Sequence, residues 1–210
     1  IIAAIIVFQP ELRKALEQLG RKNFLNNIFT FDDTKTTNER FSDRTINEII
    51  KATYELAKHK TGALMVIENE INLTEYERTG IEIDAEISNQ LLINIFEHNT
   101  PLHDGAIIIR ENRIVSATCY LPLSDNMELS KELGTRHRAG VGVSETTDSL
   151  TIIVSEETGK VSIAMGGKLI RNVDGDSLRQ ELTRVQNKTT DLKRFKIWKG
   201  RKHNEKDINR

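Results

Sequence analysis

Short apolar runs rich in β-branched residues recur along the chain and predict buried strands. Residues 62–67, 106–110 and 150–154 are almost wholly apolar, as is typical of strands covered on both faces of a sheet. Residues 81–84 instead alternate between apolar and charged side chains, which predicts a half-buried strand. Further strands are expected at residues 114–121, 160–165 and 168–173, with turns at residues 111–113 and 157–159.

Other segments carry apolar residues three or four positions apart, which predicts helices with one buried face. Such helices are expected at residues 44–59, 87–96, 135–146 and 176–187. Thr74 and Glu77 fit a capping box that would open one additional helical turn, and Asp174 or Asp176 would cap the last helix. These elements together predict a single α/β domain with a central mixed β-sheet flanked by helices.

The two ends of the chain differ from its middle. Ile1 to Phe8 is wholly apolar, but a bilayer span needs about 20 residues. Two interpretations stay open, a short buried segment or the end of a membrane helix. Spaced leucines that follow Pro10 predict a short amphipathic helix ending at Gly20. The predicted divisions are a membrane-proximal segment at residues 1–20, a linker at 21–41, a folded domain at 42–187 and a basic tail at 188–210.

Charge is unevenly distributed, although the net charge of the chain is only −1. The tail from Lys188 to Arg210 has nine basic and three acidic residues, which leaves 21 basic and 28 acidic residues elsewhere. An acidic body argues against a polymeric nucleic-acid partner. It also implies that an anionic substrate would need local basic groups and a metal ion.

Cys119 is the single cysteine, so no intrachain disulfide can form, which fits a reducing compartment. Its apolar neighbours predict a small buried side chain rather than a nucleophile. No Cys and His spacing typical of a zinc site is present in the sequence.

The loop Thr100 to Ala106 stands directly before the apolar strand at 106–110. Pro101 fixes one backbone torsion, and Gly105 permits torsions that a side chain would forbid. His103 and Asp104 are therefore held together at the entrance of a core strand, where binding sites are often built. An Asp-Gly pair between apolar runs is also a common turn, and on local chemistry that interpretation stays open.

A basic stretch, Gly134 to Arg138, opens the helix predicted at 135–146. Thr135 is a good N-cap residue, and the free N–H groups of a helix start favour anions. With Arg136, His137 and Arg138 in the first turn, the natural guest is a phosphate. A solvated helix start is the alternative.

The motifs Asp104-Gly105-Ala106 and Arg136-His137-Arg138, in this order and at this spacing, resemble the paired DGA and RHR motifs of diadenylate cyclases. The resemblance covers roughly residues 42–187 and is strongest with the membrane-anchored type of the family. Further residues that match the family pattern are His103, Tyr120-Leu121-Pro122, Gly134-Thr135 and Ser155-Glu156-Glu157.

The resemblance implies that the chain joins two ATP molecules into cyclic di-AMP and releases pyrophosphate. Asp104, Gly105 and Ala106 would be the catalytic residues. A free Asp is a weak base at neutral pH, so Asp104 would orient the ribose hydroxyl or hold a divalent metal. His103 and Asp104 would be the metal ligands, with Mn²⁺ or Mg²⁺ as the cofactor.

The same resemblance assigns the nucleotide contacts. ATP phosphates would be bound by Thr135, Arg136, His137, Arg138, Ser155, Glu156 and Glu157. Residues two apart on a helix do not share a face, so Arg138 is expected to be partly structural. A solvated turn is an equal alternative for the two glutamates. Tyr120 would stack on adenine and the Leu121 backbone would contact its edge, the alternative being an ordinary core tyrosine.

The chain shows one copy of each motif, whereas the implied product contains two identical phosphodiester links. Catalysis is therefore expected to require a face-to-face homodimer. The resemblance also implies a catalytic domain in the cytoplasm, attached to the cell membrane by N-terminal helices. The protein partners that it implies are a YbbR-type membrane regulator and a phosphoglucosamine mutase. Two alternatives are a non-catalytic adenine-nucleotide-binding regulatory module and a nucleotidyltransferase with another acceptor.

Overall fold

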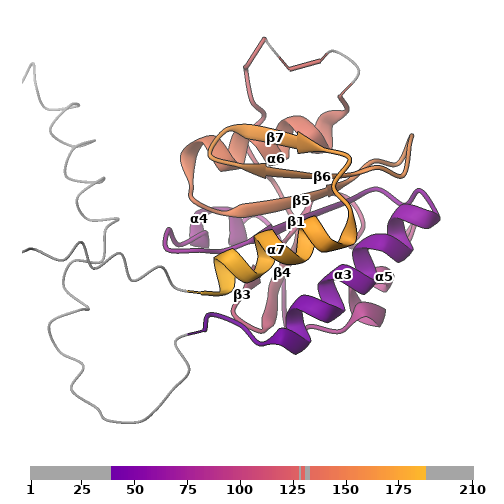
Figure 1. Cartoon of the computed structure of the whole chain (residues 1–210), viewed down its shortest axis with the longest axis vertical. Coiled ribbons are helices and arrows are strands. Elements are labelled where there is room, and N and C mark those ends of the chain that lie inside the picture. The colour runs from indigo at the N-terminus through magenta and orange to yellow at the C-terminus, as the bar shows by residue number, and fades with distance from the viewer. Residues whose placement is uncertain (1–38, 128, 131–132, 188–210) are drawn as a thin grey trace, which may run out of the picture.

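The computed structural model describes residues 39–127, 129–130 and 133–187 (Figure 1). The helices predicted within residues 1–20, nearly all of the linker and the basic tail lie outside the described residues. The strands are β1 (Ala63–Ile67), β2 (Ile81–Glu86), β3 (Ala106–Arg110), β4 (Arg113–Cys119), β5 (Leu150–Val154), β6 (Val161–Met165) and β7 (Lys168–Arg171). The helices are α3 (Asp43–Lys58), α4 (Thr74–Glu77), α5 (Asn89–Phe96), α6 (Thr135–Thr146) and α7 (Gly175–Gln186).

All seven strands form one mixed sheet in the order β2-β4-β3-β1-β5-β6-β7. The central pair, β1 and β3, is parallel, and the other pairs are antiparallel. Every residue of β1 and β5 is buried, because helices cover both faces of the centre of the sheet. The predicted α/β domain with a mixed sheet is therefore confirmed.

The alternation of side chains along the strands divides the core into two layers. Met65, Ile107 and Ile152 point to the face that is covered by α3, α5 and α7. Leu64 and Ile108 point to the opposite face, where α6 packs against them. In Figure 1, α3 and α7 lie side by side on one face and α6 lies on the other. The face covered by α6 is the one that carries the candidate site.

Two predicted helix caps are wrong, although the helices themselves form. The N-cap of α4 is Leu73, without a side-chain hydrogen bond, because the hydroxyl of Thr74 bonds Asn72 Oδ1 instead. The N-cap of α6 is Gly134, so Thr135 is already the first helical residue. Of the two aspartates predicted as alternative caps of α7, Asp174 is the N-cap, since its Oδ1 accepts a 2.8 Å hydrogen bond from Ser177 N.

The strand order brings distant segments together at one edge of the sheet. Pairing of Ala63 with Val154 places the start of β1 beside the end of β5. Pairing of Ala106 with Cys119 places the start of β3 beside the end of β4. The start of β6 and the end of β7 complete this edge. Both sequence motifs therefore lie at the same end of the domain.

Candidate functional site

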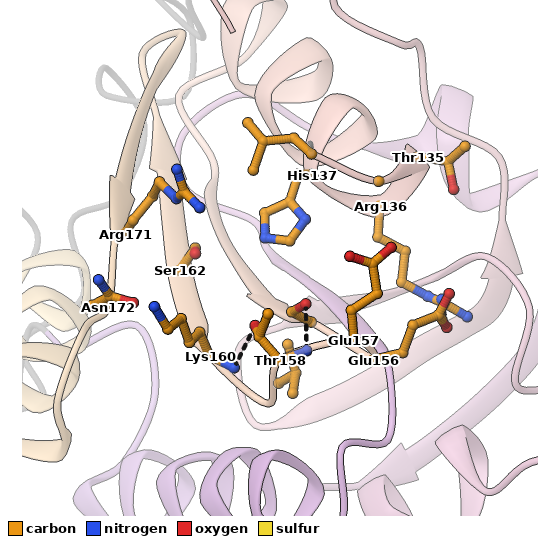
Figure 2. Close-up of a pocket in the computed structure, with 14 residues that line it drawn as sticks. Thr135, Arg136, His137, Glu156, Glu157, Thr158, Lys160, Ser162, Arg171 and Asn172 are labelled. Carbon is orange, nitrogen blue, oxygen red and sulfur yellow. Dashed lines mark hydrogen bonds and ion pairs between the residues drawn. The ribbon is translucent and has the colours of Figure 1, made fainter. Parts of the chain in front are cut away.

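A cavity of about 260 Å³ opens between the first turn of α6 and the ends of β5, β6 and β7 (Figure 2). Its lining includes most of the residues predicted to bind phosphate, namely Thr135, Arg136, His137, Ser155, Glu156 and Glu157. These residues come from two segments about twenty positions apart in the sequence. The fold thus joins the RHR helix start and the Ser-Glu-Glu turn into one concave surface.

The first turn of α6 is open towards this cavity. A Cβ atom added to Gly134 would meet no other atom within 4 Å, and Thr135 is exposed. The first N–H groups of a helix have no partner inside the helix, and they carry a partial positive charge. The helix start can therefore accept an anion through backbone groups, as the sequence predicted, although Thr135 does not cap it.

Arg136 reaches from α6 across the start of β1. Its Nη1 lies 2.5 Å from Glu156 Oε2, and a Cβ at Gly62 would come within 2.8 Å of Nη1. Glycine at position 62 is therefore what leaves room for the guanidinium. The buried Nε of Arg136 has no hydrogen-bond partner among the described residues. Arg136 thus anchors Glu156 while it retains donor capacity at the site.

His137 is buried at the cavity wall, with 8% of its surface exposed. Burial lowers the pKa of this imidazole, the positive charge of Arg171 lowers it further, and Glu157 acts in the opposite direction. The side chain is therefore neutral at neutral pH in the free protein. A neutral imidazole can donate one hydrogen bond and accept another.

Arg138 does not line the cavity. Its backbone carbonyl accepts a 3.0 Å hydrogen bond from Ser124 N, which ties α6 to the loop that follows β4. The two arginines of the motif therefore lie on different sides of the helix, in line with the expected separation. Whether either of them contacts a nucleotide stays a prediction.

The turn from β5 to β6 is held by its own hydrogen bonds. Ser155 Oγ accepts from Thr158 N at 3.2 Å, and Ser155 O accepts from Gly159 N at 2.8 Å. Thr158 Oγ1 in turn accepts from Lys160 N at 3.2 Å (Figure 2). The segment is thus an ordered turn that also lines the cavity, so the two interpretations of Ser155-Glu156-Glu157 do not exclude each other.

The DGA loop lies beside the cavity and does not line it. Gly105 has a φ of +103°, and a Cβ at this position would come within about 3.0 Å of the backbone of Thr118 and Cys119. Glycine is therefore required for β4 to pack against the loop. Thr118 Oγ1 also donates a 3.3 Å hydrogen bond to Leu102 O. Asp104 is exposed at this rigid position, and its side chain has no hydrogen-bond or ion-pair partner among the described residues.

The hydrogen bond of His103 determines its tautomer. Its Nδ1 lies 2.6 Å from the carbonyl oxygen of Thr100, and a carbonyl can only accept, so Nδ1 carries the proton. The lone pair of the neutral ring is then on Nε2, the atom that could bind a metal. Within the described part of the chain, no three His, Cys, Asp or Glu side chains are close enough to hold a metal ion. A metal ion held by His103 and Asp104 would therefore have to take its other ligands from a nucleotide or from water.

Tyr120 is not a core residue, because 71% of its surface is exposed. Its backbone N donates a 2.9 Å hydrogen bond to Thr79 Oγ1, which fixes the chain where β4 ends. Leu121 is half-buried and packs against the core layer beneath α6. The core interpretation of Tyr120 is therefore wrong, and its ring is accessible for stacking. Cys119 is buried as predicted, and burial raises the pKa of its thiol.

The cavity residues that the sequence reasoning missed include Lys160, Ser162, Arg171 and Asn172. They lie on β6, on β7 and at the ends of these strands, outside any motif. One signal was available for Lys160 and Ser162. Positions 160, 162 and 164 alternate onto one face of the predicted strand. The position of Arg171 and Asn172 at the cavity could not be predicted from the local sequence, because it depends on the pairing of Ser162 on β6 with Arg171 on β7.

Comparison of the sequence with known families and proteins gives a consistent result. The family described as "DisA bacterial checkpoint controller nucleotide-binding", or DAC, matches residues 50–169. A Bacillus subtilis protein named cyclic di-AMP synthase CdaA is 50% identical over 205 residues, covering 96% of this chain and 72% of that protein. A Listeria monocytogenes diadenylate cyclase is 51% identical with the same coverage. A Mycoplasma pneumoniae diadenylate cyclase is 35% identical and covers 75% of this chain and 77% of that protein.

Solved structures agree with the sequence comparison. The crystal structure of a double mutant of DacA from Staphylococcus aureus has a TM-score of 0.68 and 47% identity. The structural match covers 69% of this chain and 96% of the Staphylococcus aureus chain. A Bacillus cereus structure described as a hypothetical membrane spanning protein has a TM-score of 0.61 and 34% identity, with coverage of 81% and 80%. Among the described residues of this chain, no helix has the length and apolar character needed to cross a membrane.

Proposed function

The chain belongs to the DAC family of diadenylate cyclases, and from this premise we propose that it condenses two ATP molecules into cyclic di-AMP and two pyrophosphates. The observation that carries the proposal is the meeting of the DGA loop, the RHR helix start and the Ser-Glu-Glu turn at one edge of one sheet. Each of these segments alone has an ordinary structural interpretation. Together they supply a carboxylate, anion-binding N–H groups and cations along a continuous surface.

The size of the cavity suggests how ATP would lie. At about 260 Å³ it is smaller than the roughly 300–1,000 Å³ typical of sites that enclose a whole drug-sized ligand. We therefore place only the triphosphate in the cavity, where the α6 start and the cations are. The ribose would lie at Gly105 and the adenine at Tyr120. Neighbouring strands are about 4.8 Å apart, so the three steps from β4 to β5 span roughly 14 Å. This is the length of the edge along which the adenine, the ribose and the triphosphate would lie.

The reaction forms a bond between the 3′-oxygen of one ATP and the α-phosphorus of the other. The bond from that phosphorus to the bridging oxygen of the β-phosphate breaks, and pyrophosphate leaves with the electron pair. Asp104 would accept a hydrogen bond from the 3′-hydroxyl and orient it in line with the α-phosphorus. The hydroxyl proton passes to solvent water as the new bond forms. Two such transfers close the ring.

A divalent metal would neutralise phosphate charge and lower the pKa of the attacking hydroxyl. His103, through Nε2, and Asp104 are the residues that would hold Mn²⁺ or Mg²⁺. The carbonyl of Thr100 would orient the His103 ring, since it accepts the Nδ1–H hydrogen bond. This donor set suits an ion that takes most of its ligands from the nucleotide.

Catalysis would take place between two chains, because each chain holds one DGA loop and one RHR helix start. A two-fold axis would bring each 3′-hydroxyl against the α-phosphorus of the ATP on the facing chain. Specific activity should therefore rise with protein concentration until the dimer is saturated. Adding inactive Asp104→Asn chains to wild-type chains should lower activity through mixed dimers. Activity per chain that does not change down to low nanomolar concentration would contradict the dimer.

The reaction itself is tested by incubating the protein with ATP and Mn²⁺ or Mg²⁺ and identifying the products by mass spectrometry. We expect cyclic di-AMP and two pyrophosphates per ring. Binding of ATP without turnover under both metals would favour the regulatory-module alternative. A linear adenylylated product would instead indicate a nucleotidyltransferase with another acceptor.

Membrane attachment is a further part of the proposal. It is supported by the apolar run Ile1 to Phe8 and by the similar Bacillus cereus chain that is described as membrane spanning. Association with a YbbR-type regulator and with a phosphoglucosamine mutase rests on the family resemblance alone. Co-purification of the membrane-extracted protein with each candidate would test these partners separately.

A further inference from the structure

Two cations on the wall of the cavity opposite Arg136 have no ion-pair partner among the described residues. Lys160 stands at the entrance of β6, and Arg171 is the last residue of β7. In Figure 2 both side chains lie on the β6–β7 side, and the Arg171 guanidinium is directed towards the space in front of His137. Arg136, by contrast, is already paired with Glu156. Both cations are exposed to the cavity or to solvent, and no described carboxylate forms an ion pair with either of them.

A hydroxyl that faces the cavity lies between these two cations. Ser162 is only 2% exposed as a residue and lines the cavity, and its Oγ, which stays accessible from the cavity, has no hydrogen-bond partner among the described residues. A hydroxyl that faces a cavity without a protein partner can both donate and accept a hydrogen bond with water or a ligand. A ligand in the cavity would satisfy this group.

Strand geometry explains why the three side chains face the same way. Ser162 pairs directly with Arg171, and Ala164 pairs with Leu169, so these residues share one face of the sheet. Ala164 belongs to the core layer beneath α6, which identifies that face as the one bearing the cavity. Lys160 lies two positions before Ser162 and continues the same row. The arrangement is therefore built into the β6–β7 hairpin.

We propose that Lys160, Ser162 and Arg171 form a subsite for the terminal phosphates of ATP, which is the part that leaves as pyrophosphate. This inference rests on the proposed function. The ribose lies at β3 in that proposal, and β6 and β7 are three and four strands away from β3 in the sheet order. This wall lines the same cavity as the α6 start, so a triphosphate that enters the cavity from the ribose side would direct its β- and γ-phosphates towards the side chains of Lys160 and Arg171.

The subsite would separate substrate from product. Cyclic di-AMP keeps only the two α-phosphates, so it has no group that reaches Lys160 and Arg171. Contacts made by this wall would then increase the affinity for ATP without increasing the affinity for the ring. Free pyrophosphate, in contrast, would retain the contacts and compete with ATP.

The test compares Arg171→Ala and Lys160→Ala with Lys168→Ala. Lys168 is an exposed cation of the same strand, β7, and its position places it on the opposite face from Arg171. Inorganic pyrophosphate and cyclic di-AMP are titrated calorimetrically into each variant, and the KM for ATP is measured in parallel. We expect pyrophosphate affinity to fall about tenfold with Arg171→Ala, by the loss of one charge-assisted contact, and the KM for ATP to rise by a similar factor. Arg171→Lys should restore part of the loss.

Three outcomes would overturn the subsite. The first is no measurable binding of pyrophosphate to the wild-type protein. The second is equal pyrophosphate affinity of wild type and Arg171→Ala, and the third is a loss of pyrophosphate affinity in Lys168→Ala as large as that in Arg171→Ala. A parallel loss of cyclic di-AMP affinity would also contradict it. Because the titrations do not require turnover, they decide the subsite even if the wild-type protein makes no cyclic di-AMP, a result that would remove the proposed function instead.

Discussion

The face of the sheet that is covered by α6 carries charged side chains at both ends of its strands. They are paired with one another at one end and largely unpaired at the other. At the end where β1 and β3 finish, arginine and glutamate form a closed network. At the end where β1 and β3 begin, cations and hydroxyls face a cavity with few protein partners. The difference separates charges that hold the fold together from charges that remain available to a ligand.

The closed end is centred on Arg110. Its Nε lies 2.7 Å from Glu68 Oε1, and its Nη2 lies 2.9 Å from Glu68 Oε2 and 2.7 Å from Glu77 Oε2. Glu68 also accepts a 2.8 Å hydrogen bond from Leu73 N. The hydrogen bonds with Glu68 raise the pKa of Arg110 further, and burial acts against them. Each charge therefore has a protein partner, and the network ties α4 to the sheet.

The open end contains Lys160, Arg171 and the exposed carboxylate of Asp104, none of which has an ion pair among the described residues. Its backbone is nevertheless rigid, since Gly105 and the Ser155 turn are held by close packing and hydrogen bonds. Rigid backbone with unpaired polar side chains is what a preorganised binding site requires. Charge alone does not identify the site, whereas cations without an ion pair that line a cavity with a rigid backbone do.

The largest expected effect is that of Asp104→Asn at the open end. The substitution keeps the shape and removes the charge that orients the hydroxyl, so turnover should fall by about 10²–10⁴-fold. The free energy of unfolding should be unchanged, because Asp104 is exposed. Turnover of ATP and chemical denaturation are measured on the same preparation. Near-normal turnover of Asp104→Asn would show that the carboxylate of Asp104 has no role in the mechanism.

At the closed end, Arg110→Ala should act on stability. It leaves Glu68 and Glu77 without their partner in a partly buried place, and we expect the free energy of unfolding to fall by about 2–4 kcal/mol. Urea denaturation checks this value, with Arg171→Ala as the matched control at the open end. The control should stay within about 0.5 kcal/mol of wild type. Equal losses for the two variants would break the distinction between the ends.

Arg136→Ala is expected to have an intermediate effect, because this residue combines both roles. Loss of a charge-assisted contact should weaken ATP binding by about 1–3 kcal/mol, measured by calorimetry. Glu156→Gln provides the comparison, since it removes the protein partner of Arg136 and leaves the arginine in place. Unchanged ATP affinity of Arg136→Ala would show that Arg136 has a structural role and does not contact ATP.

The smallest effect concerns pH. Folding lowers the pKa of His137, so the folded state resists protonation of this ring more than the unfolded chain does. The stability associated with the neutral ring is therefore present above the unfolded pKa of about 6.5, and it is lost as the pH falls through the lower folded value. His137→Gln should flatten this part of the stability curve between pH 8 and 5 in urea denaturation. An unchanged pH dependence would contradict the assignment.

Much of the fold could be predicted because its signals are local. The apolar run at 150–154 and the helix at 135–146 were predicted with the bounds that the structure gives them. The errors also have local causes. Thr135 and Thr74 have the chemistry of cap residues, but Gly134 and Leu73 occupy those positions, since the chain enters each helix one residue earlier.

The candidate site was only partly predictable, for reasons of topology. Asp104 and the RHR residues lie in compact motifs that the sequence displays directly. Arg171 and Ser162 contribute through the pairing of β6 with β7, which no local pattern specifies. The network of Arg110 with Glu68 was also not predicted, because the two residues are far apart in sequence and lie at the ends of the parallel pair β3 and β1.

The most direct test of the central claim is a crystal structure of the protein with 3′-deoxy-ATP, which lacks the attacking hydroxyl and cannot be cyclised. We expect the triphosphate between the start of α6 and the β6–β7 wall, the ribose at Gly105 and the adenine against Tyr120. The network around Arg110 should be unchanged. Nucleotide bound elsewhere, or a triphosphate directed away from His137 and Arg171, would contradict the claim that the unpaired charges of this edge are the ATP site.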